Sequence, residues 1–283
     1  MPIENVSDTA RWVAVYRAME TARPDAIFRD PFAERLAGER GQRIVNEMKR
    51  GRQMAWAMIV RTAVMDELIL DRIANGGVDV VINLAAGLDT RAWRLPLPPT
   101  LQWFDVELPE MAAYKASQMR GETPACRYEA IAVDLTSDVA RDDLLRRLAG
   151  VSRTALVVTE GLLVYLEAEQ VASLARALRA QPSIRWWLTD IASPRLLVMM
   201  NRWWGKAVAA GNAPFRFAPA DSASFFASLG WRETAFRSAV EEARRLKREM
   251  PLMWLWRLLG LLTSRARREG VRRMSGVILL ERA

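Results

Sequence analysis

Histidine is absent from the 283-residue sequence, and cysteine occurs once, as Cys126. Without an imidazole, a Ser-His-Asp triad, a histidine-ligated zinc site and a histidine general base are excluded. A single cysteine excludes an internal disulfide and a thiolate metal cluster, and it suits a reducing compartment. The longest apolar run, Pro251–Thr263, contains Arg257 and falls short of the roughly 20 apolar residues of a membrane-spanning helix. We therefore expect a cytoplasmic protein without a metal site or a stable membrane insertion.

Acidic residues are fewer than basic ones, 33 against 41, so the formal net charge is +8. A strongly basic chain suggests nucleic acid or an anionic membrane as a partner. Residues 237–282, however, hold twelve Lys and Arg and five Asp and Glu, so one segment carries most of the excess. We expect no nucleic-acid partner. Within this segment, Glu241–Arg273 is interpreted as a helix with a solvated basic face, and an amphipathic helix on a membrane is the alternative.

Short runs rich in β-branched residues alternate with helical segments after an N-terminal part, residues 8–75, that itself has helical spacing. The predicted strands are Val78–Leu84, Gln102–Leu108, Tyr128–Leu135, Ala155–Thr159, Ile184–Ile191 and Gly276–Leu280. Strands that alternate with helices predict an α/β fold, a mostly parallel sheet with helices on both faces. No linker or repeat interrupts the pattern, so we expect one domain. In such sheets the ligand binds beyond the carboxyl ends of the strands.

Small residues follow the first strand, in the segment Asn83–Arg91 (NLAAGLDTR). A turn made of Ala85, Ala86 and Gly87 lets a ligand approach the backbone closely. With one glycine, it does not match the dinucleotide fingerprint G-x-G-x-x-G, so a pyrophosphate cradle is not expected. The turn either contacts a nucleoside or an amino-acid group, or it is a tight turn without a ligand.

Acidic residues end the next three strands. Asp105 and Glu107 lie two apart on the second strand and therefore share a face. Glu107 follows Gly87 by about the 20-residue spacing at which an acid meets ribose hydroxyls in nucleoside-binding units. Asp134 ends the third strand, where it could meet an adenine edge, and Glu160 ends the fourth, where an open α/β sheet places its active site. For each acid the alternative is a solvated side chain at a strand end.

Several of these segments resemble the leucine carboxyl methyltransferase family, which includes bacterial polyketide carboxyl O-methyltransferases. The resemblance covers nearly the whole chain, and its motifs occur in the family's order. The matching segments are Arg29–Ala33 (RDPFA), Arg61-Thr62, Ile82–Leu95 (INLAAGLDTRAWRL), Phe104–Pro109 (FDVELP), Glu160–Leu166 (EGLLVYL) and Arg273–Gly276 (RMSG).

The resemblance implies a Rossmann-like class I methyltransferase with a seven-stranded sheet and S-adenosylmethionine as its cofactor. It also implies an N-terminal helical cap over residues 1–75, a cofactor-binding core over 76–192, and a substrate cover with inserted helices over 193–283. The implied site residues are Arg61, with Arg17 as a second candidate, for the cofactor's carboxylate; Ala85, Ala86 and Gly87 for its methionine part; Glu107 for the ribose; Asp134 and Leu135 for the adenine; and Glu160 and Tyr165 beside the cofactor's amino group and the substrate.

The chain departs from the family pattern at two positions. Ala85 stands where the family usually has glycine, so an added methyl group could crowd the cofactor. Glu107 stands where the family commonly has aspartate, so Asp105 competes for the ribose. The segment Ser193–Gly211, which is rich in Met and Trp, is interpreted as core packing, and a mobile apolar cover over the substrate is the alternative.

The missing histidine favours one kind of acceptor. A carboxylate is ionised at neutral pH and needs no general base, whereas a hydroxyl usually does. We therefore predict transfer of a methyl group to the carboxylate of a small, apolar or polyketide-like molecule. Methylation of a phenol, an alcohol or a protein C-terminal carboxylate is the first alternative. A non-enzymatic module that binds membrane or nucleic acid through the basic tail is the second. The sequence does not predict the oligomeric state.

Overall fold

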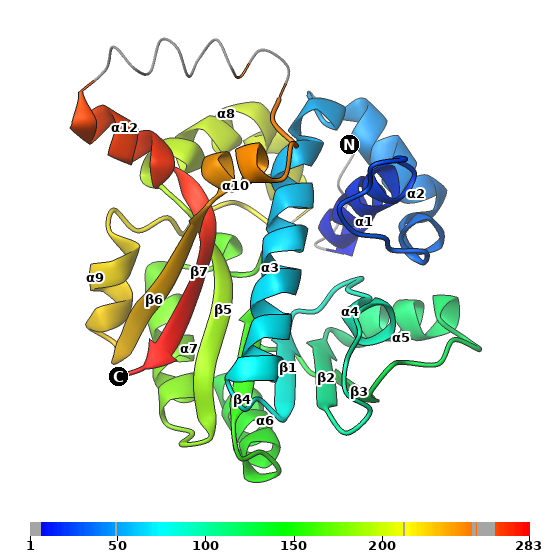
Figure 1. Cartoon of the computed structure of the whole chain (residues 1–283), viewed down its shortest axis with the longest axis vertical. Helices are drawn as coiled ribbons and strands as arrows, with labels where there is room; N and C mark the ends of the chain where they lie inside the picture. Colours follow the sequence, from blue (N-terminus) through cyan, green and yellow to red (C-terminus); the bar gives the residue numbers. More distant parts are fainter. Residues whose placement is uncertain (1–6, 49, 212, 251–252, 254–263) are drawn as a thin grey trace.

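A seven-stranded sheet forms the centre of the computed structural model, which describes residues 7–48, 50–211, 213–250, 253 and 264–283. The strand order is β3-β2-β1-β4-β5-β7-β6 (Figure 1). The bounds are β1 (Val80–Leu84), β2 (Gln102–Glu107), β3 (Arg127–Ala132), β4 (Ala155–Thr159), β5 (Ile184–Ala192), β6 (Trp231–Ser238) and β7 (Ser275–Arg282). The pairs among β1 to β5 are parallel, while β7 runs antiparallel to both β5 and β6. The predicted α/β class with a mostly parallel sheet is confirmed.

Helices cover both faces of this sheet. Their bounds are α1 (Ser7–Thr21), α2 (Ala33–Glu47), α3 (Ala55–Asn75), α4 (Arg91–Arg94), α5 (Pro109–Gln118), α6 (Asp138–Gly150), α7 (Ala168–Arg179), α8 (Pro194–Ala210), α9 (Ser222–Ala227), α10 (Ala239–Arg245) and α12 (Arg265–Arg272), with short 3-10 turns η1 (Arg52–Met54) and η2 (Leu163–Tyr165). No helix in these described ranges is both long and apolar enough to cross a bilayer.

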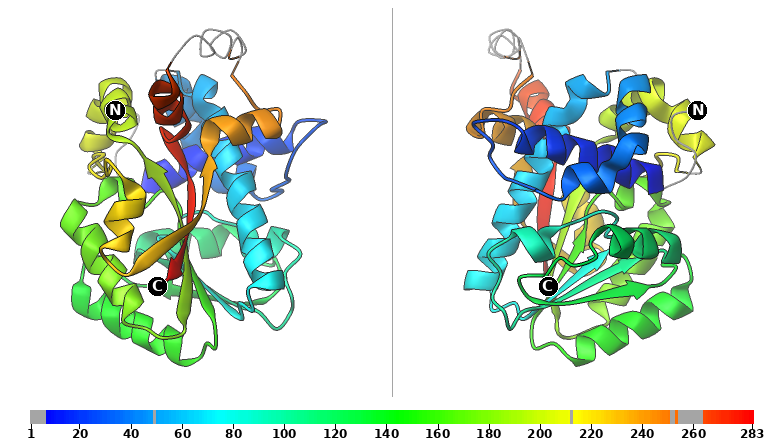
Figure 2. Two further views of the ribbon diagram at one scale, coloured as in Figure 1. Left: turned by 60° about the vertical axis from the view of Figure 1, so that its left-hand side comes forward. Right: turned by 90° about the vertical axis from the view of Figure 1, so that its right-hand side faces the viewer.

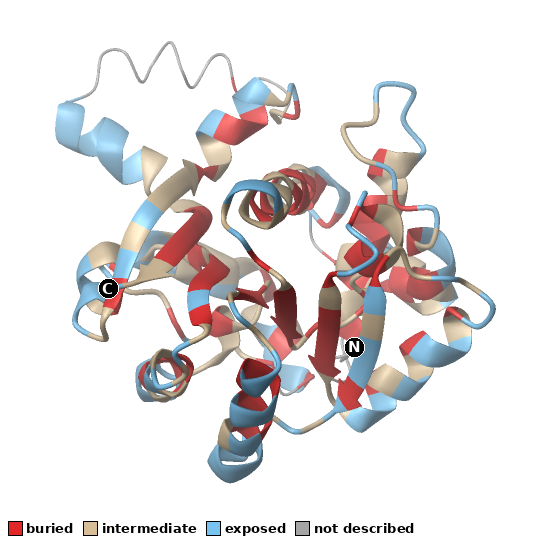
Figure 3. Cartoon of the chain, turned by 60° about the horizontal axis from the view of Figure 1, so that its bottom comes forward, coloured by how far each residue is buried: buried red, intermediate tan, exposed pale blue. Residues whose placement is uncertain are grey.

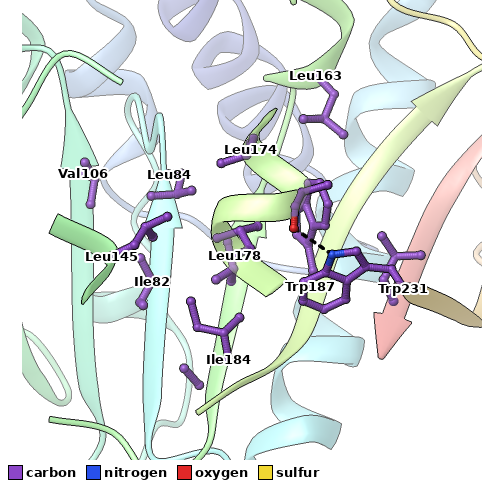
Figure 4. Close-up of a cluster of buried hydrophobic side chains, with 14 of the residues drawn as sticks. Ile82, Leu84, Val106, Leu145, Leu163, Leu174, Leu178, Ile184, Trp187 and Trp231 are labelled. Atoms are coloured by element: carbon purple, nitrogen blue, oxygen red, sulfur yellow. Dashed lines mark hydrogen bonds between the residues drawn. The ribbon is translucent and has the colours of Figure 1, made fainter. Parts of the chain in front are cut away.

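Two apolar cores result from the alternation of side chains along the strands. On one face, Ile82 and Leu84 of β1 pack with α6 and α7, among side chains such as Leu145 and Leu178 (Figure 4). On the other face, Val81 and its neighbours pack against α3 and α4. Every residue of β1 and of β4 is buried, which suits central parallel strands. Burial is concentrated in the inner strands, whereas the edge strands β3 and β6 and the outer sides of the helices are largely exposed or half-buried (Figure 3).

A third apolar cluster lies at the carboxyl edge of the sheet. It joins α1, α2 and the start of α3 to Trp204 and Val208 of α8, and it includes Leu88 after β1 and Met111 on α5. Figure 2 shows α1 and α2 lying across the end of the molecule above the sheet. The N-terminal helices therefore form a roof over the edge at which the strand ends present their polar residues.

The observed strand ends differ from the sequence-based prediction by at most three residues, and the largest difference is at the end of β3. β3 ends at Ala132 rather than Leu135, because the Asp134 side chain accepts hydrogen bonds from the backbone N–H and the hydroxyl of Thr136 and starts a turn. β6 was not named from its pattern. It is an edge strand with the sequence WRETAFRS, and its charged and half-exposed residues hide the period expected of a buried strand.

Candidate active site

A cavity of about 1650 Å³ runs along the carboxyl edge of the sheet. Pockets for one drug-sized ligand measure about 300–1,000 Å³, so this cavity has room for a cofactor and an acceptor together. The predicted residues that line it are Arg17, Arg61, Ala85, Ala86, Gly87, Glu107, Asp134, Leu135, Glu160 and Tyr165. Their grouping at one edge follows from the topology, since parallel strands end on the same side.

The turn after β1 is tight and partly strained. Ala85 has a φ of 53°, a left-handed conformation that glycine adopts more easily, and Gly87 has a φ of 52°. A Cβ on Gly87 would lie 3.1 Å from the Cβ of Ala10, so α1 packs directly on the turn. The predicted Gly-to-Ala departure thus falls on a residue whose backbone conformation favours glycine.

Glu107 and Asp105 have different surroundings although they share a strand face. Glu107 lines the cavity, and its carboxylate accepts the backbone N–H of Gly87 at 2.6 Å and of Leu108 at 2.7 Å. Burial raises the pKa of Glu107. Asp105 is not part of the cavity lining; it accepts hydrogen bonds from Lys115 at 2.5 Å and from Asn83 at 3.1 Å. The geometry therefore favours Glu107 over Asp105 for the ribose.

Asp134 and Leu135 lie at the β3 end of the cavity. Asp134 is exposed at the rim, and its hydrogen bonds with Thr136 lower the pKa of its carboxyl. Arg17 comes from the roof, where its Nε donates to Asp30 Oδ2 at 2.8 Å and its Nη2 to the Leu88 carbonyl at 2.5 Å. These positions spread the predicted cofactor contacts from α1 to β3.

Beneath the roof, arginines and carboxylates form a connected network, here called the charged floor. Its members are Arg61, Asp66, Asp89, Arg91, Arg94, Glu160 and Asp190. Glu160 accepts from Arg61 Nε at 3.0 Å and from Arg91 Nη1 at 2.7 Å. The network contains three arginines and four carboxylates, so its formal charge is one unit negative. Such a floor suits a cationic group such as a sulfonium.

Fixed charges set the titration of the floor. Burial would raise the pKa of Glu160, but the charges of Arg91 and Arg61 outweigh it and hold that pKa below its ordinary value. Arg61 also pairs with Asp190 at 3.0 Å, and Asp190 accepts the backbone N–H of Gly161 at 2.6 Å. Gly161 has a φ of 66°, and a Cβ there would lie 3.3 Å from Arg61 Nη1. A glycine at this turn therefore lets the guanidinium lie against the backbone.

Five of the seven floor residues were not predicted from the sequence: Asp66, Asp89, Arg91, Arg94 and Asp190. Asp89, Arg91 and Arg94 lie within the segment Ile82–Leu95, and Asp190 is an acid near the carboxyl end of β5, the same signal that identified Glu160. Arg61 was assigned to the cofactor's carboxylate, and in the structure its guanidinium also orients Glu160 and Asp190. A cofactor carboxylate at Arg61 would join an existing network rather than meet an unpaired cation.

Apolar side chains close the cavity opposite the floor. Met199, Met200, Trp203 and Trp204 of α8 line it, and the buried Trp204 packs edge-on against Trp12 at a ring-centroid distance of 5.2 Å. Tyr165 stacks on Phe215 at 5.6 Å, and burial raises its pKa. Segment Ser193–Gly211 thus contributes both to core packing and to the cavity wall. The predicted helix Glu241–Arg273 is not one continuous helix, because α10 ends at Arg245, Lys247 has a left-handed φ of 55°, and α12 begins at Arg265. Residues 251, 252 and 254–263, which also belong to the alternative of an amphipathic helix on a membrane, lie outside the described residues.

Comparison with known proteins identifies the family of the chain. The leucine carboxyl methyltransferase family model matches residues 10–179. A Frankia alni protein named for S-adenosyl-L-methionine-dependent methyl transfer is 33% identical over 244 residues, covering 81% of this chain and 83% of that protein. A similarly named Streptomyces coelicolor protein is 36% identical over 180 residues, covering 59% of this chain and 62% of that protein.

A solved structure supports the fold. The crystal structure of a DUF574 family protein from Streptomyces avermitilis has a TM-score of 0.61 with this chain at 14% identity, and the match covers 95% of this chain and 97% of the other. It confirms the predicted architecture. The family model and the Frankia alni relative confirm the predicted enzyme class, an S-adenosylmethionine-dependent methyltransferase. The chain belongs to the leucine carboxyl methyltransferase family.

Proposed function

We propose that this chain transfers a methyl group from S-adenosylmethionine to a carboxylate of a small apolar, polyketide-like molecule. The apolar wall made by α8 supports an apolar acceptor, because it would bury hydrocarbon surface beside the reacting group. We place the reaction in the cytoplasm, where the unlinked Cys126 suits the reducing conditions.

The observation that carries the carboxylate assignment is the poor basicity of two side chains that line the cavity, Glu160 in the charged floor and Tyr165. Arg61 and Arg91 hold Glu160 ionised, with a pKa below its ordinary value, and burial raises the pKa of Tyr165. A weakly basic carboxylate and a phenol that keeps its proton are poor general bases near neutral pH. The sequence contains no histidine to replace them. A carboxylate acceptor arrives ionised, so the chain needs only to hold and orient it.

The residues that line the cavity fit the cofactor. Glu107 uses each carboxylate oxygen for one backbone N–H, and each oxygen keeps a lone pair that could accept a ribose hydroxyl. The negative floor would hold the cofactor's cationic groups, and Arg17 and Arg61 would hold its carboxylate. When bound, the cofactor supplies an activated methyl group. The chain then contributes position, exclusion of water by α1 and α8, and fixed charge.

A labelled-methyl assay tests the acceptor class. The protein is incubated with methyl-labelled S-adenosylmethionine and with medium-chain fatty and aryl acids, beside the alcohols and phenols of matching skeleton. We expect label in the acids, released by alkali because methyl esters hydrolyse and ethers do not. Alkali-stable label in an alcohol or phenol would establish the hydroxyl alternative instead. Label in a peptide's C-terminal carboxylate, and not in the small acids, would establish the protein alternative.

Cofactor binding is tested separately by calorimetry. We expect heat of binding at sub-millimolar S-adenosylmethionine, reduced in Glu107→Gln. No heat at near-millimolar cofactor with folded protein would contradict the proposal for every acceptor.

A further inference from the structure

The cavity has a second group of arginines in addition to those of the charged floor. Arg195 at the start of α8, Arg244 on α10, and Arg267 and Arg268 on α12 line it, and all four are exposed. We call these four residues the arginine mouth. The elements that carry them follow β5, follow β6 and precede β7, so they lie at the opposite end of the strand order from β3 and Asp134 (Figure 1).

The guanidinium groups of the arginine mouth are not compensated by carboxylates among the described residues. Within the described part of the chain, none of its four guanidinium groups lies in an ion pair or on an aromatic ring. Neighbouring arginines behave differently. Arg237, which also lines the cavity, pairs with Glu242 at 2.6 Å and with Glu67 at 3.0 Å. Arg237 is thus held by carboxylates, whereas the N–H donors of the four mouth arginines remain available to a ligand.

The elements that carry the mouth also contribute apolar side chains to the cavity wall. Met200 and Trp203 lie on α8, Val240 lies on α10, and Met274 directly precedes β7. An acceptor whose carboxylate reaches the floor would lay its hydrocarbon part along this wall. Its far end would then lie among guanidinium groups, which bind carboxylate and phosphate oxygens through paired N–H donors.

We propose that the arginine mouth binds a second anionic group, a phosphate or a carboxylate, at the far end of the acceptor. The acceptor is then an apolar acid with charge at both ends rather than a simple hydrophobic acid. This inference rests on the proposed function, because it places the reacting carboxylate at the floor. It explains why cations are exposed at the rim of a cavity whose wall is apolar.

Binding measured without turnover tests the inference separately from the proposed function. Tryptophan fluorescence, to which Trp203 in the wall contributes, is titrated with dodecanoic acid, dodecanedioic acid and ω-phosphonododecanoic acid at low salt. We expect at least one doubly anionic ligand to bind about tenfold more tightly than the monoacid, since exposed ion pairs each contribute little and several act together. The advantage should shrink as salt is raised. The diacid and the phosphono acid distinguish the two kinds of anion.

Variants assign the effect to the mouth. Arg267→Gln with Arg268→Gln, and separately Arg195→Gln with Arg244→Gln, should each reduce the advantage of the doubly anionic ligand by at least about threefold. Arg265→Gln is the matched control, because Arg265 is an exposed arginine of α12 that is not part of the cavity lining. Equal binding of all three ligands, or an equal loss in the control, would overturn the inference. Preferred binding without methyl transfer would uphold it and contradict the proposed function.

Discussion

The charged floor and the arginine mouth line the same cavity and use the same cation in opposite ways. In the floor, Arg91 is 2% exposed at its side chain and bonds to three carboxylates, whereas Arg268 in the mouth is exposed and unpaired within the described residues. Burying a charge costs several kcal/mol unless partners compensate it, so buried arginines come with fixed carboxylates. This desolvation cost is small for exposed arginines, so they need no fixed carboxylate and remain able to bind an anionic ligand. The floor therefore sets geometry, and the mouth is suited to selecting the acceptor.

Removing a floor arginine should have the largest effect of any change considered. Arg91→Met leaves Asp66, Asp89 and Glu160 without a shared counter-charge, so we expect a loss of about 3–5 kcal/mol in the free energy of unfolding. Urea denaturation at pH 7 measures it. The matched change Arg268→Met in the mouth should stay within about 0.5 kcal/mol. Equal losses at the two positions would remove the distinction between floor and mouth.

The next largest effect concerns catalysis. Glu160→Gln keeps the shape of the side chain but removes the charge that Arg61 and Arg91 share, so both guanidinium groups should shift. Misplacement by about 1 Å can cost about 100-fold in rate, and we expect kcat to fall by that order. Initial rates over a range of acceptor concentrations give kcat and KM. Arg267→Gln should instead raise KM for a doubly anionic acceptor and leave kcat unchanged. A full kcat in Glu160→Gln would show that the floor does not position the reaction.

The two acids of β2 offer a finer comparison at the cofactor's end. Glu107→Gln should weaken cofactor binding about tenfold, because a charged acceptor of hydrogen bonds is replaced by a neutral one. Asp105→Asn should change binding less and lower stability instead, since Lys115 would lose its buried partner. Calorimetry and urea denaturation on both variants separate the two effects. The reverse order of affinities would assign the ribose to Asp105.

The raised pKa of Glu107 predicts opposite pH effects on binding and folding. Because burial raises this pKa, acidification protonates Glu107 before an ordinary glutamate, and cofactor affinity should fall as pH drops through that pKa. The effect on stability has the opposite sign, because the pKa of Glu107 is higher in the folded than in the unfolded state. The contribution of Glu107 to stability is fully present at pH values below its unfolded-state pKa, and it disappears as pH rises through its folded-state pKa. Calorimetry and denaturation over a pH series test both signs. Glu107→Gln should flatten both dependences, and an unchanged pH profile in that variant would assign them to other groups.

The smallest effects concern two backbone positions that line the cavity, Ala85 and Gly161. Ala85→Gly relieves a left-handed conformation and should stabilise the fold by up to about 1 kcal/mol, while Gly161→Ala should destabilise it by more, because its Cβ would press on Arg61. Thermal unfolding measures both. Gly150→Ala, at the end of α6 with open space around its Cβ, is the control. A stabilising Gly161→Ala would show that the turn is not constrained by the floor.

The strand ends were predictable because their signals are local. The small turn at Ala85–Gly87, the acid at Glu107 and the acid at Glu160 each follow an apolar run, and parallel topology brings such ends together. The choice between Asp105 and Glu107 needed the structure. Both share a face, and Lys115, ten residues further on α5, decides which one is neutralised.

The pairing within the floor could not be predicted from the sequence. Arg61 meets Glu160 across 99 residues and Asp190 across 129, and the sequence holds too many arginines and carboxylates to select these pairs. The edge strand β6 was missed for a related reason. Its period is masked by charges such as Arg232, which pairs with Glu281 of the neighbouring β7. The floor pairs and β6 were therefore not predictable, because they depend on charge pairs between residues far apart in the sequence rather than on local propensity.

The family match ends at Arg179, the last residue of α7, before β5 begins. The mouth and most of the apolar wall belong to α8, α10 and α12, which are inserted between strands that the sheet already holds in place. Under the proposed function, the strand ends hold the methyl donor, and α8, α10 and α12 contact the acceptor. A chimera that takes residues 193–230 and 239–274 from a relative would carry the relative's acceptor preference on this sheet. A change of acceptor would then need no change in any strand of the sheet.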